Sequence, residues 1–457
     1  MDEATPSNDV HLSTIYFNKN DVHEIINNMN ANSAPGPDGF RPILLKNLNN
    51  FLCLPLSILF MLIFQSGKLP DAWKIALVKP IFKKGSSSDP NNYRPISLTS
   101  IVCKIFEAII KKYLVSYLAT YSLISKHQHN FLERHSTTSN LMECLNDWTL
   151  ALDNKKFVKI LYIDFAKTFD VVSVPKLMYK LGKYGIKGLL FSCIESFLTN
   201  RSQRVCVGNA ISESLPLISG TPQGSVLGPI LFLMFINDLP DLYYDGLRAK
   251  LLADDLKSYN LFDYRNNPDN IQASLDSLMG WSKSWQLQLA VSKCGSLLLK
   301  GNSSFVDEHE LFINNNPLGV LEIVKDLGVL VDSKLNFSAQ IDSIVVKAKQ
   351  RIFLIFKSFE SRDVTLFVFA YKTYILPILD YCSTIWFPNK LEDIDRIEKV
   401  QRYFTKRLFG LRLMSYTDRL VACGLSSLEL RRLRTDIILC FKIIHKLIAL
   451  NFDDFFV

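Results

Sequence analysis

LLADDLKSY, residues 251–259, places two aspartates side by side after an apolar run. Adjacent carboxylates repel each other, Asp is a poor strand residue, and an unpaired buried charge is strongly destabilising. Two explanations stay open: a solvated β-turn, where Asp is favoured, or a site at which cations neutralise both charges. The flanking pattern over residues 247–262 predicts a strand, a turn and a second strand, with Asp254 and Asp255 at the turn.

The composition is that of a globular protein. The chain has 457 residues, 48% hydrophobic and 21% charged, which indicates two or three subdomains. The net charge of +8 is compatible with a polyanionic partner but does not require one. Nine scattered cysteines without a CxxC pair argue against a zinc site and fit reduced thiols in an intracellular protein.

No membrane association is expected. The first ten residues, MDEATPSNDV, do not form a signal peptide. The apolar run at 51–64 is too short to span a bilayer and contains Pro55, so a buried helix is expected there. We therefore expect a soluble intracellular protein, either nuclear or cytoplasmic.

Apolar periodicity predicts a mixed α+β region followed by an all-helical one. The helices are expected at 20–33, 43–64, 96–118, from Ser173 to near Gly182 or Gly185, at 225–238 and at 271–287, and from Phe337 to the end. Within the helix at 96–118, Glu107 and Lys111 have the spacing of a surface ion pair. The strands are expected at 73–85, 158–165, 294–299 and 327–331, with a hairpin at 204–220 that turns at Gly208 and Asn209.

A third carboxylate, Asp164, ends the apolar strand 158–165. Three carboxylates at the ends of neighbouring strands could hold two divalent cations, and hard oxygen ligands without Cys or His suit Mg²⁺ or Mn²⁺. Between these acids lies SGTPQGSVLGPILFLMFINDLP, 219–240. Its glycines permit close approach to a ligand and Gln223 offers a donor and an acceptor, although a loop leading into a core helix explains the segment equally well.

The order of the motifs resembles that of a known family. IDFAKTFD, SGTPQGSVLGPILFLMFINDLP and KLLADDLKSY, in this order, resemble the palm motifs of reverse transcriptases. Upstream, APGPDGF and PIFKKGSSSDPNNYRPISLTSIVCKIFEAII resemble the finger motifs of the LINE-type, jockey-like branch, the polymerases of non-LTR retrotransposons. Downstream, WSKSWQLQLAVSKC and KDLGVLVDSKLNFSAQI continue the pattern. Seven blocks from about residue 25 to 411 carry this resemblance.

The resemblance implies a right-hand polymerase with fingers, a palm built on an antiparallel sheet, and a helical thumb. The corresponding boundaries are 1–72 for an N-terminal finger extension, 73–157 for the fingers, 158–335 for the palm with part of the fingers, and 336–457 for the thumb and C-terminal region.

The resemblance also implies a metal site. Asp164, Asp254, Asp255 and the carbonyl of Phe165 match the ligands of two Mg²⁺ or Mn²⁺ ions, with Asp254 the stronger ligand of the adjacent pair. Lys293 matches a lysine that protonates the leaving pyrophosphate. Without the family match, an isolated surface lysine would need no special role.

Five further residues match substrate-binding positions. Lys83 and Arg94 match the residues that grip the incoming triphosphate, Phe169 matches the steric gate against a 2′-hydroxyl, and Gln223 and Gly224 match the loop that packs on the templating base pair. Read without the resemblance, the two cations form a solvated basic loop and Phe169 is a core aromatic. Asp170 is expected to cap or brace the next helix.

The implied activity is RNA-directed DNA synthesis, in which a DNA primer 3′-hydroxyl attacks a dNTP on an RNA template. Such elements usually encode an endonuclease as well, so a nick from another protein is expected here, and the chain is expected to be a fragment. A decayed, non-enzymatic nucleic-acid-binding remnant is the alternative.

Several positions depart from the family pattern and favour this alternative. Asn130 stands where Gly is usual and is expected to adopt a strained positive φ. The other departures are Arg134 and His135 in place of Gly-Arg, Thr168 in place of Ala, and Leu252 and Leu256 beside the aspartates.

Overall fold

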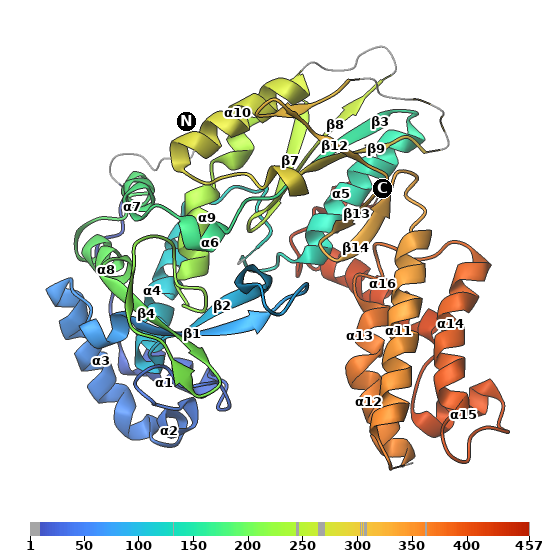
Figure 1. The fold of residues 1–457 in the computed structure, drawn as a ribbon, viewed down its shortest axis with the longest axis horizontal. Coiled ribbons are helices and arrows are strands. Elements are labelled where there is room, and N and C mark those ends of the chain that lie inside the picture. The colour runs from blue at the N-terminus through green and yellow to red at the C-terminus, as the bar shows by residue number, and fades with distance from the viewer. Residues whose placement is uncertain are drawn as a thin grey trace.

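The structure is a computed structural model that describes residues 10–456, apart from 131, 244–245, 264–269, 302, 304, 306–308 and 362. The start MDEATPSND therefore lies outside the described residues. Within them the predicted α+β organisation is confirmed: two sheets with surrounding helices are followed by a purely helical C-terminal region (Figure 1).

The central sheet has the strand order β12-β9-β3-β8-β7. Strand β3 pairs antiparallel with both β8 and β9, β7 pairs antiparallel with β8, and β12 runs parallel to β9. The strands are β3 (Phe157–Ile163), β7 (Leu247–Leu252), β8 (Asp255–Phe262), β9 (Gly295–Leu299) and β12 (Gly319–Leu321). Two short hairpins lie beside it, formed by β10 (Phe312–Ile313) with β11 (Asn316–Pro317) and by β13 (Ile323–Asp326) with β14 (Val329–Asp332).

A second sheet, the outer sheet, has the order β2-β1-β4-β5, with β6 also paired to β4. Its strands are β1 (Ile75–Phe82), β2 (Tyr93–Leu98), β4 (Arg201–Val207), β5 (Ala210–Ile211) and β6 (Leu215–Leu217). The predicted turn at Gly208 and Asn209 is confirmed by the β4–β5 pairing. The helix predicted from Ile96 is wrong at its start, because residues 96–98 complete strand β2 through pairing with β1.

Helices cover both faces of the central sheet. Because side chains alternate along a strand, Leu161 and Ile163 face one hydrophobic cluster, whereas Val158 and Ile160 face another. The first cluster contains α4 (Ile101–Thr120), α7 (Val174–Lys183), α8 (Gly188–Leu198), α9 (Gly228–Ile236) and α10 (Asn270–Trp285). The second contains α5 (Thr137–Asp153), α11 (Ser338–Ser358), α12 (Val364–Tyr374), α13 (Leu376–Asp380) and α14 (Leu391–Lys406).

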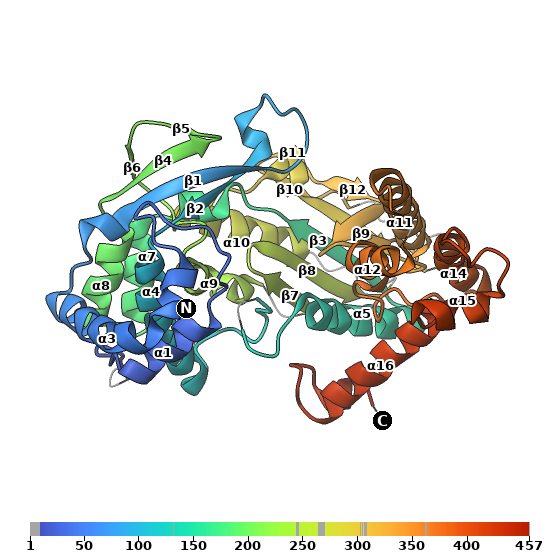
Figure 2. The same ribbon diagram turned by 90° about the horizontal axis from the view of Figure 1, so that it is seen from below.

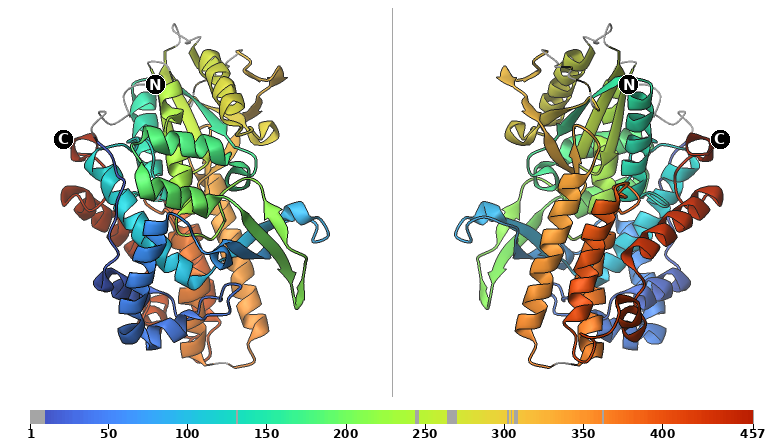
Figure 3. Two further views of the ribbon diagram at one scale, coloured as in Figure 1. Left: turned by 90° about the vertical axis from the view of Figure 1, so that its left-hand side faces the viewer. Right: turned by 90° about the vertical axis from the view of Figure 1, so that its right-hand side faces the viewer.

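The N-terminal helices and the C-terminal helices lie at opposite ends of the molecule, with the central sheet between them (Figures 1 and 2). At the first end are α1 (Lys19–Asn28), α2 (Pro42–Asn47) and α3 (Asn49–Ser66). At the other, α11 and α14 pack side by side (Figure 3), followed by α15 (Tyr416–Cys423) and α16 (Leu428–Ile444).

Helix α3 differs from its predicted state. It has 18 residues, and among the described residues it is the one helix long and apolar enough to cross a membrane. One face is buried, with Phe60 and Phe64 in the first hydrophobic cluster, but the other face is exposed and includes Phe51. The prediction of a buried helix is therefore correct for one face only, since the helix packs against α1 and α8 on a single side.

Glu107 does not form the predicted surface pair with Lys111. Its side chain is completely buried in α4, and its Oε2 accepts hydrogen bonds from the backbone N–H groups of Val226 (2.7 Å) and Leu227 (3.0 Å). These groups lead into α9, so Glu107 binds the positive end of that helix. Burial raises the pKa of Glu107, and the two backbone hydrogen bonds oppose this rise.

Candidate active site

The adjacent aspartates lie at the end of the hairpin formed by β7 and β8. Leu252 pairs with Asp255, so Ala253 and Asp254 form a two-residue turn. Strand β3 pairs with β8 such that Ile163 lies opposite Leu256. Asp164 directly follows Ile163, the last residue of β3, and Asp255 directly precedes Leu256 at the start of β8. Both acids therefore lie at the same edge of the central sheet. The predicted placement at neighbouring strand ends is confirmed.

Each of two acids has a polar partner. Lys293 Nζ lies 2.7 Å from Asp164 Oδ2, and the Thr168 hydroxyl donates a hydrogen bond of 2.7 Å to Asp254 Oδ2. Asp255 is an exposed side chain on the rim of the site. Partial desolvation, together with the negative charges of Asp254 and Asp164, raises the pKa of Asp255 to about 6. The site therefore carries uncompensated negative charge.

Phe165 follows Asp164 directly and fixes the chain that leaves β3. The segment pairs with residues 288–290: Ala166 N–H donates to the Gln288 carbonyl and Ala290 N–H donates to the Asp164 carbonyl, both at 2.8 Å. The Phe165 ring packs edge-on against Trp281 with ring centroids 6.3 Å apart. These contacts place Lys293, three residues beyond Ala290, beside Asp164.

Phe169 lies on the short helix α6 (Thr168–Val171), and its ring packs against Phe232 of α9 with centroids 4.5 Å apart. The loop 219–224 holds this helix, because Thr221 N–H donates to the Phe169 carbonyl at 2.8 Å. Gly220 has φ of +83°, and a Cβ there would lie 2.6 Å from the carbonyl oxygens of Phe169 and Asp170. Only glycine permits this close contact.

Gln223 and Gly224 connect α6 to the outer sheet. Gln223 Nε2 donates to Asp170 Oδ1 at 2.9 Å, and the Gln223 carbonyl accepts from Ser97 N–H of β2 at 2.7 Å. At Gly224, with φ of +116°, a Cβ would lie 2.5 Å from the Ser97 carbonyl oxygen. Asp170 thus braces this loop rather than capping the next helix, and burial raises its pKa.

The two cations of the outer sheet differ in their relation to the acids. Arg94 of β2 lines the same cavity, of about 600 Å³, as Asp164, Asp255 and Lys293. Lys83 lies in the exposed turn after β1 and does not line this cavity, although its positive charge partly opposes the rise in the pKa of Asp170 that burial causes. Arg94 therefore lines the same cavity as the acids, whereas Lys83 lies outside it.

The three acids are not arranged as a complete metal-binding site in the structure. Among the residues that the structure describes, no three acidic, histidine or cysteine side chains converge closely enough to hold one metal ion. Asp164 is bound by Lys293 and Asp254 by Thr168. The donor chemistry nonetheless fits a hard divalent cation, because three carboxylates share one edge and their mutual repulsion is not neutralised.

One feature beside the acids escapes sequence reasoning, and one predicted feature is misplaced. Lys257 and Asp326, 5% and 4% exposed, form a buried ion pair of 2.7 Å that joins β8 to the β13–β14 hairpin. Asn130, in contrast, lies outside the residues with positive φ, so the predicted strain there is wrong; the strained residue of that loop is Arg134, with φ of +64°. No local signal predicts the Lys257–Asp326 pair, because its members come from distant segments, whereas Arg134 stands where the family pattern has glycine, the residue that adopts positive φ without strain.

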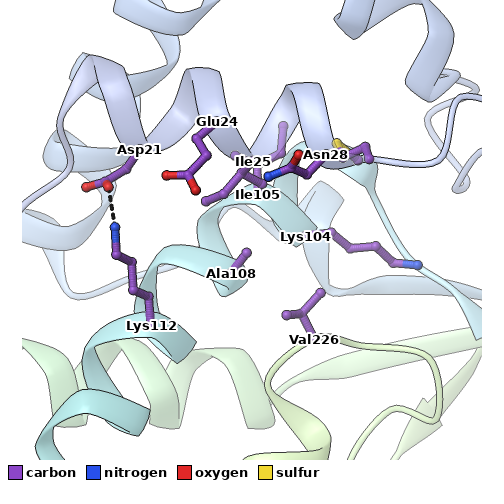
Figure 4. Close-up of a pocket in the computed structure, with 10 residues that line it drawn as sticks. Asp21, Glu24, Ile25, Asn28, Lys104, Ile105, Ala108, Lys112 and Val226 are labelled. Carbon is purple, nitrogen blue, oxygen red and sulfur yellow. Dashed lines mark hydrogen bonds and ion pairs between the residues drawn. The ribbon is translucent and has the colours of Figure 1, made fainter. Parts of the chain in front are cut away.

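A second cavity, of about 380 Å³, lies between α1 and α4 (Figure 4). Ile25, Ala108 and Val226 line it, and the ion pair between Lys112 and Asp21, of 2.6 Å, lies at its rim. It contains none of the predicted site residues.

Carboxylates at the edge of a mixed sheet, with a lysine paired to one of them and an arginine lining the same cavity, are side chains of the kind that phosphoryl transfer uses. The family described as Reverse transcriptase (RNA-dependent DNA polymerase) matches residues 81–338, more than half of the chain. The chain therefore belongs to the reverse transcriptase family.

The similar proteins come from mobile elements, which confirms the predicted LINE-type branch. The chain is 27% identical over 404 residues to the probable RNA-directed DNA polymerase from transposon X-element of Drosophila melanogaster, covering 86% of this chain and 44% of that protein. It is 26% identical over 404 residues to the RNA-directed DNA polymerase from mobile element jockey of the same organism, covering 85% and 43%. The chain thus spans less than half the length of these relatives.

Proposed function

We propose that this chain is an RNA-directed DNA polymerase that extends a DNA primer on an RNA template. The observation that carries the proposal is the common edge of β3 and β8, where Asp164, Asp254 and Asp255 lie beside Lys293 and Arg94. Family membership supports the same reaction. In that reaction the bond between the primer O3′ and the α-phosphorus forms, and the bond to pyrophosphate breaks.

The subdomains of a right hand can be assigned on the same basis. We assign 1–72, with α1–α3, to a finger extension and 73–157, with β1, β2, α4 and α5, to the fingers. Residues 158–335, with the central sheet and with β4–β6 of the outer sheet, form the palm with part of the fingers, and 336–457 form the thumb and C-terminal region. Helix α11 exposes Lys347, Lys349 and Arg351. These cations suit the phosphate backbone of a template–primer duplex.

Asp164, Asp254, Asp255 and the Phe165 carbonyl would hold two divalent cations, Mg²⁺ or Mn²⁺. When bound, the ions would activate the primer hydroxyl and stabilise charge on the triphosphate. Lys293 would exchange its contact with Asp164 for the leaving pyrophosphate and give it a proton. Without bound cations the negative charges of the three acids repel one another, as the raised pKa of Asp255 indicates.

The remaining site residues would bind the nucleotide. Arg94 would pair with the triphosphate through its planar guanidinium, and Lys83 would approach it after movement of the β1–β2 turn. Phe169 would lie beneath the sugar, and Gln223 with Gly224 would support the templating pair. Phe169→Val should admit ribonucleotides; unchanged discrimination between dNTP and rNTP would remove Phe169 from this role.

The proposed activity is intracellular, and a nick supplied by a separate endonuclease would provide the primer. The alternative is a remnant that binds nucleic acid without turnover. Two observations favour this alternative. Asp164 forms an ion pair with Lys293, and among the described residues the acids do not lie close enough together to hold one metal ion. Both candidates predict binding that weakens steeply with salt, so only synthesis separates them.

The decisive experiment is extension of oligo(dT) on poly(rA) by the purified chain with Mg²⁺ or Mn²⁺. The double variant Asp254→Asn/Asp255→Asn should bind duplex but not extend it. Asp276→Asn, on the exposed surface of α10, provides the matched control because its carboxylate accepts a hydrogen bond from Gln272 and does not line the cavity of the acids. Synthesis by wild type and Asp276→Asn alone would establish the polymerase. Folded, duplex-binding wild type without synthesis would establish the remnant.

A further inference from the structure

The turn that carries Asp254 has an unusual residue. Ala253 precedes Asp254, is buried and has φ of +56°. Two-residue hairpins of this kind usually place glycine at positive φ, because a Cβ crowds the following carbonyl in that conformation. The alanine turn is therefore strained, and a strained turn persists only where its surroundings hold it.

The segment from His127 to His129 pairs with the free edge of β7 through an isolated parallel bridge. Leu251 N–H donates to the His127 carbonyl and His129 N–H donates to the Leu251 carbonyl, both at 2.9 Å. Gln128 lies between these two residues and pairs with Leu251 in parallel register. The segment thus reaches the β7–β8 hairpin from outside the central sheet and covers its edge.

The side chain of Gln128 reaches the strained turn. It is 1% exposed, and its Oε1 accepts hydrogen bonds from the backbone N–H groups of Ala253 (3.2 Å) and Asn130 (3.1 Å). Two N–H donors identify the accepting atom as oxygen. Its Nε2 is buried and finds no partner among the described residues. A buried unpaired donor is destabilising, so this glutamine is not explained by stability alone.

We propose that Gln128 is a positioning residue that holds the Ala253–Asp254 turn, and with it the Asp254 carboxylate, at the edge of the central sheet. The backbone is held by Gln128 from one side, and Thr168 holds the carboxylate from the other. Without Gln128, Ala253 relaxes towards negative φ and Asp254 moves away from Asp164. The inference rests on the proposed function, because it assigns Asp254 to metal binding.

The test compares Gln128→Met with Gln340→Met. Both change a buried glutamine whose Oε1 accepts from a backbone N–H, but Gln340 accepts from Leu330 of β14 (3.0 Å) and not from the turn that carries Asp254. Mn²⁺ binding is measured by electron paramagnetic resonance, and primer extension is titrated with Mg²⁺. Gln128→Met should weaken both about three- to tenfold, the factor expected from one hydrogen bond. Gln340→Met should lower stability without shifting either metal dependence.

Ala253→Gly provides the mechanistic control. Glycine adopts φ of +56° without strain, so the effect of Gln128→Met should largely disappear in this background. An unchanged Mn²⁺ affinity of Gln128→Met, or an equally large effect in the Ala253→Gly background, would overturn the proposal. Gln128→Asn, whose amide is one methylene too short, should reproduce the loss if the methionine variant does not fold.

Mn²⁺ binding also separates this inference from the proposed function. Wild-type protein that binds Mn²⁺ through Asp254 but synthesises no DNA would contradict the polymerase and leave the role of Gln128 testable. A wild type that synthesises DNA, with metal dependence insensitive to Gln128, would contradict the positioning role alone.

Discussion

Gly220→Ala should separate the loop 219–224 from α6. A Cβ at Gly220 would lie 2.6 Å from the carbonyl oxygens of Phe169 and Asp170, well below the roughly 3.3 Å of a close carbon–oxygen contact. Positive φ at an alanine costs about 1–2 kcal/mol. Displacement of the loop would weaken two backbone hydrogen bonds of 2.8 Å, to Phe169 and Val172, at about 1 kcal/mol each. The free energy of unfolding should therefore fall by about 3–4 kcal/mol.

Gly208→Ala is the matched control. Gly208 also has positive φ, +58°, but nothing lies within 4 Å of the added Cβ. This variant should therefore lose only the about 1–2 kcal/mol of backbone strain. Urea unfolding of both variants measures the difference, and dNTP against rNTP incorporation tests whether Phe169 has moved. Equal losses of stability in the two variants would refute the steric reasoning at Gly220.

Three further predictions concern the acids and their neighbours. Thr168→Val should destabilise the protein by about 1–2 kcal/mol through loss of the hydrogen bond to Asp254, and Thr168→Ser should not; urea unfolding distinguishes them. Asp255 has a folded pKa of about 6, above its unfolded value, so its contribution to stability is present below about pH 4 and is lost as the pH rises through 6. In chelator-treated protein, Asp255→Asn should therefore raise thermal stability at pH 8 but not at pH 4; a pH-independent effect would contradict this pKa. Lys257→Met should cost about 3–5 kcal/mol by leaving the buried Asp326 carboxylate without its cation, and Lys257→Met/Asp326→Leu should recover most of it; the urea midpoints of the single and double variants test this.

Local patterns predicted much of the fold. A continuous apolar run of strand length located β3, and the paired aspartates located the turn between β7 and β8, because apolar runs and turn chemistry are properties of neighbouring residues. The motif order indicated the family, and the match over residues 81–338 confirmed it. The three acids could therefore be assigned to one edge before any contact was known.

Other features were decided by the tertiary structure alone. Glu107 has the spacing of a surface ion pair, yet it is buried against residues more than a hundred positions away. Thr168 bonds to Asp254, and Gln128 bonds to Ala253, again over long separations in sequence. A sequence pattern fixes which face of an element is apolar, whereas the partner of a buried polar group depends on which distant backbone the fold brings within hydrogen-bonding distance.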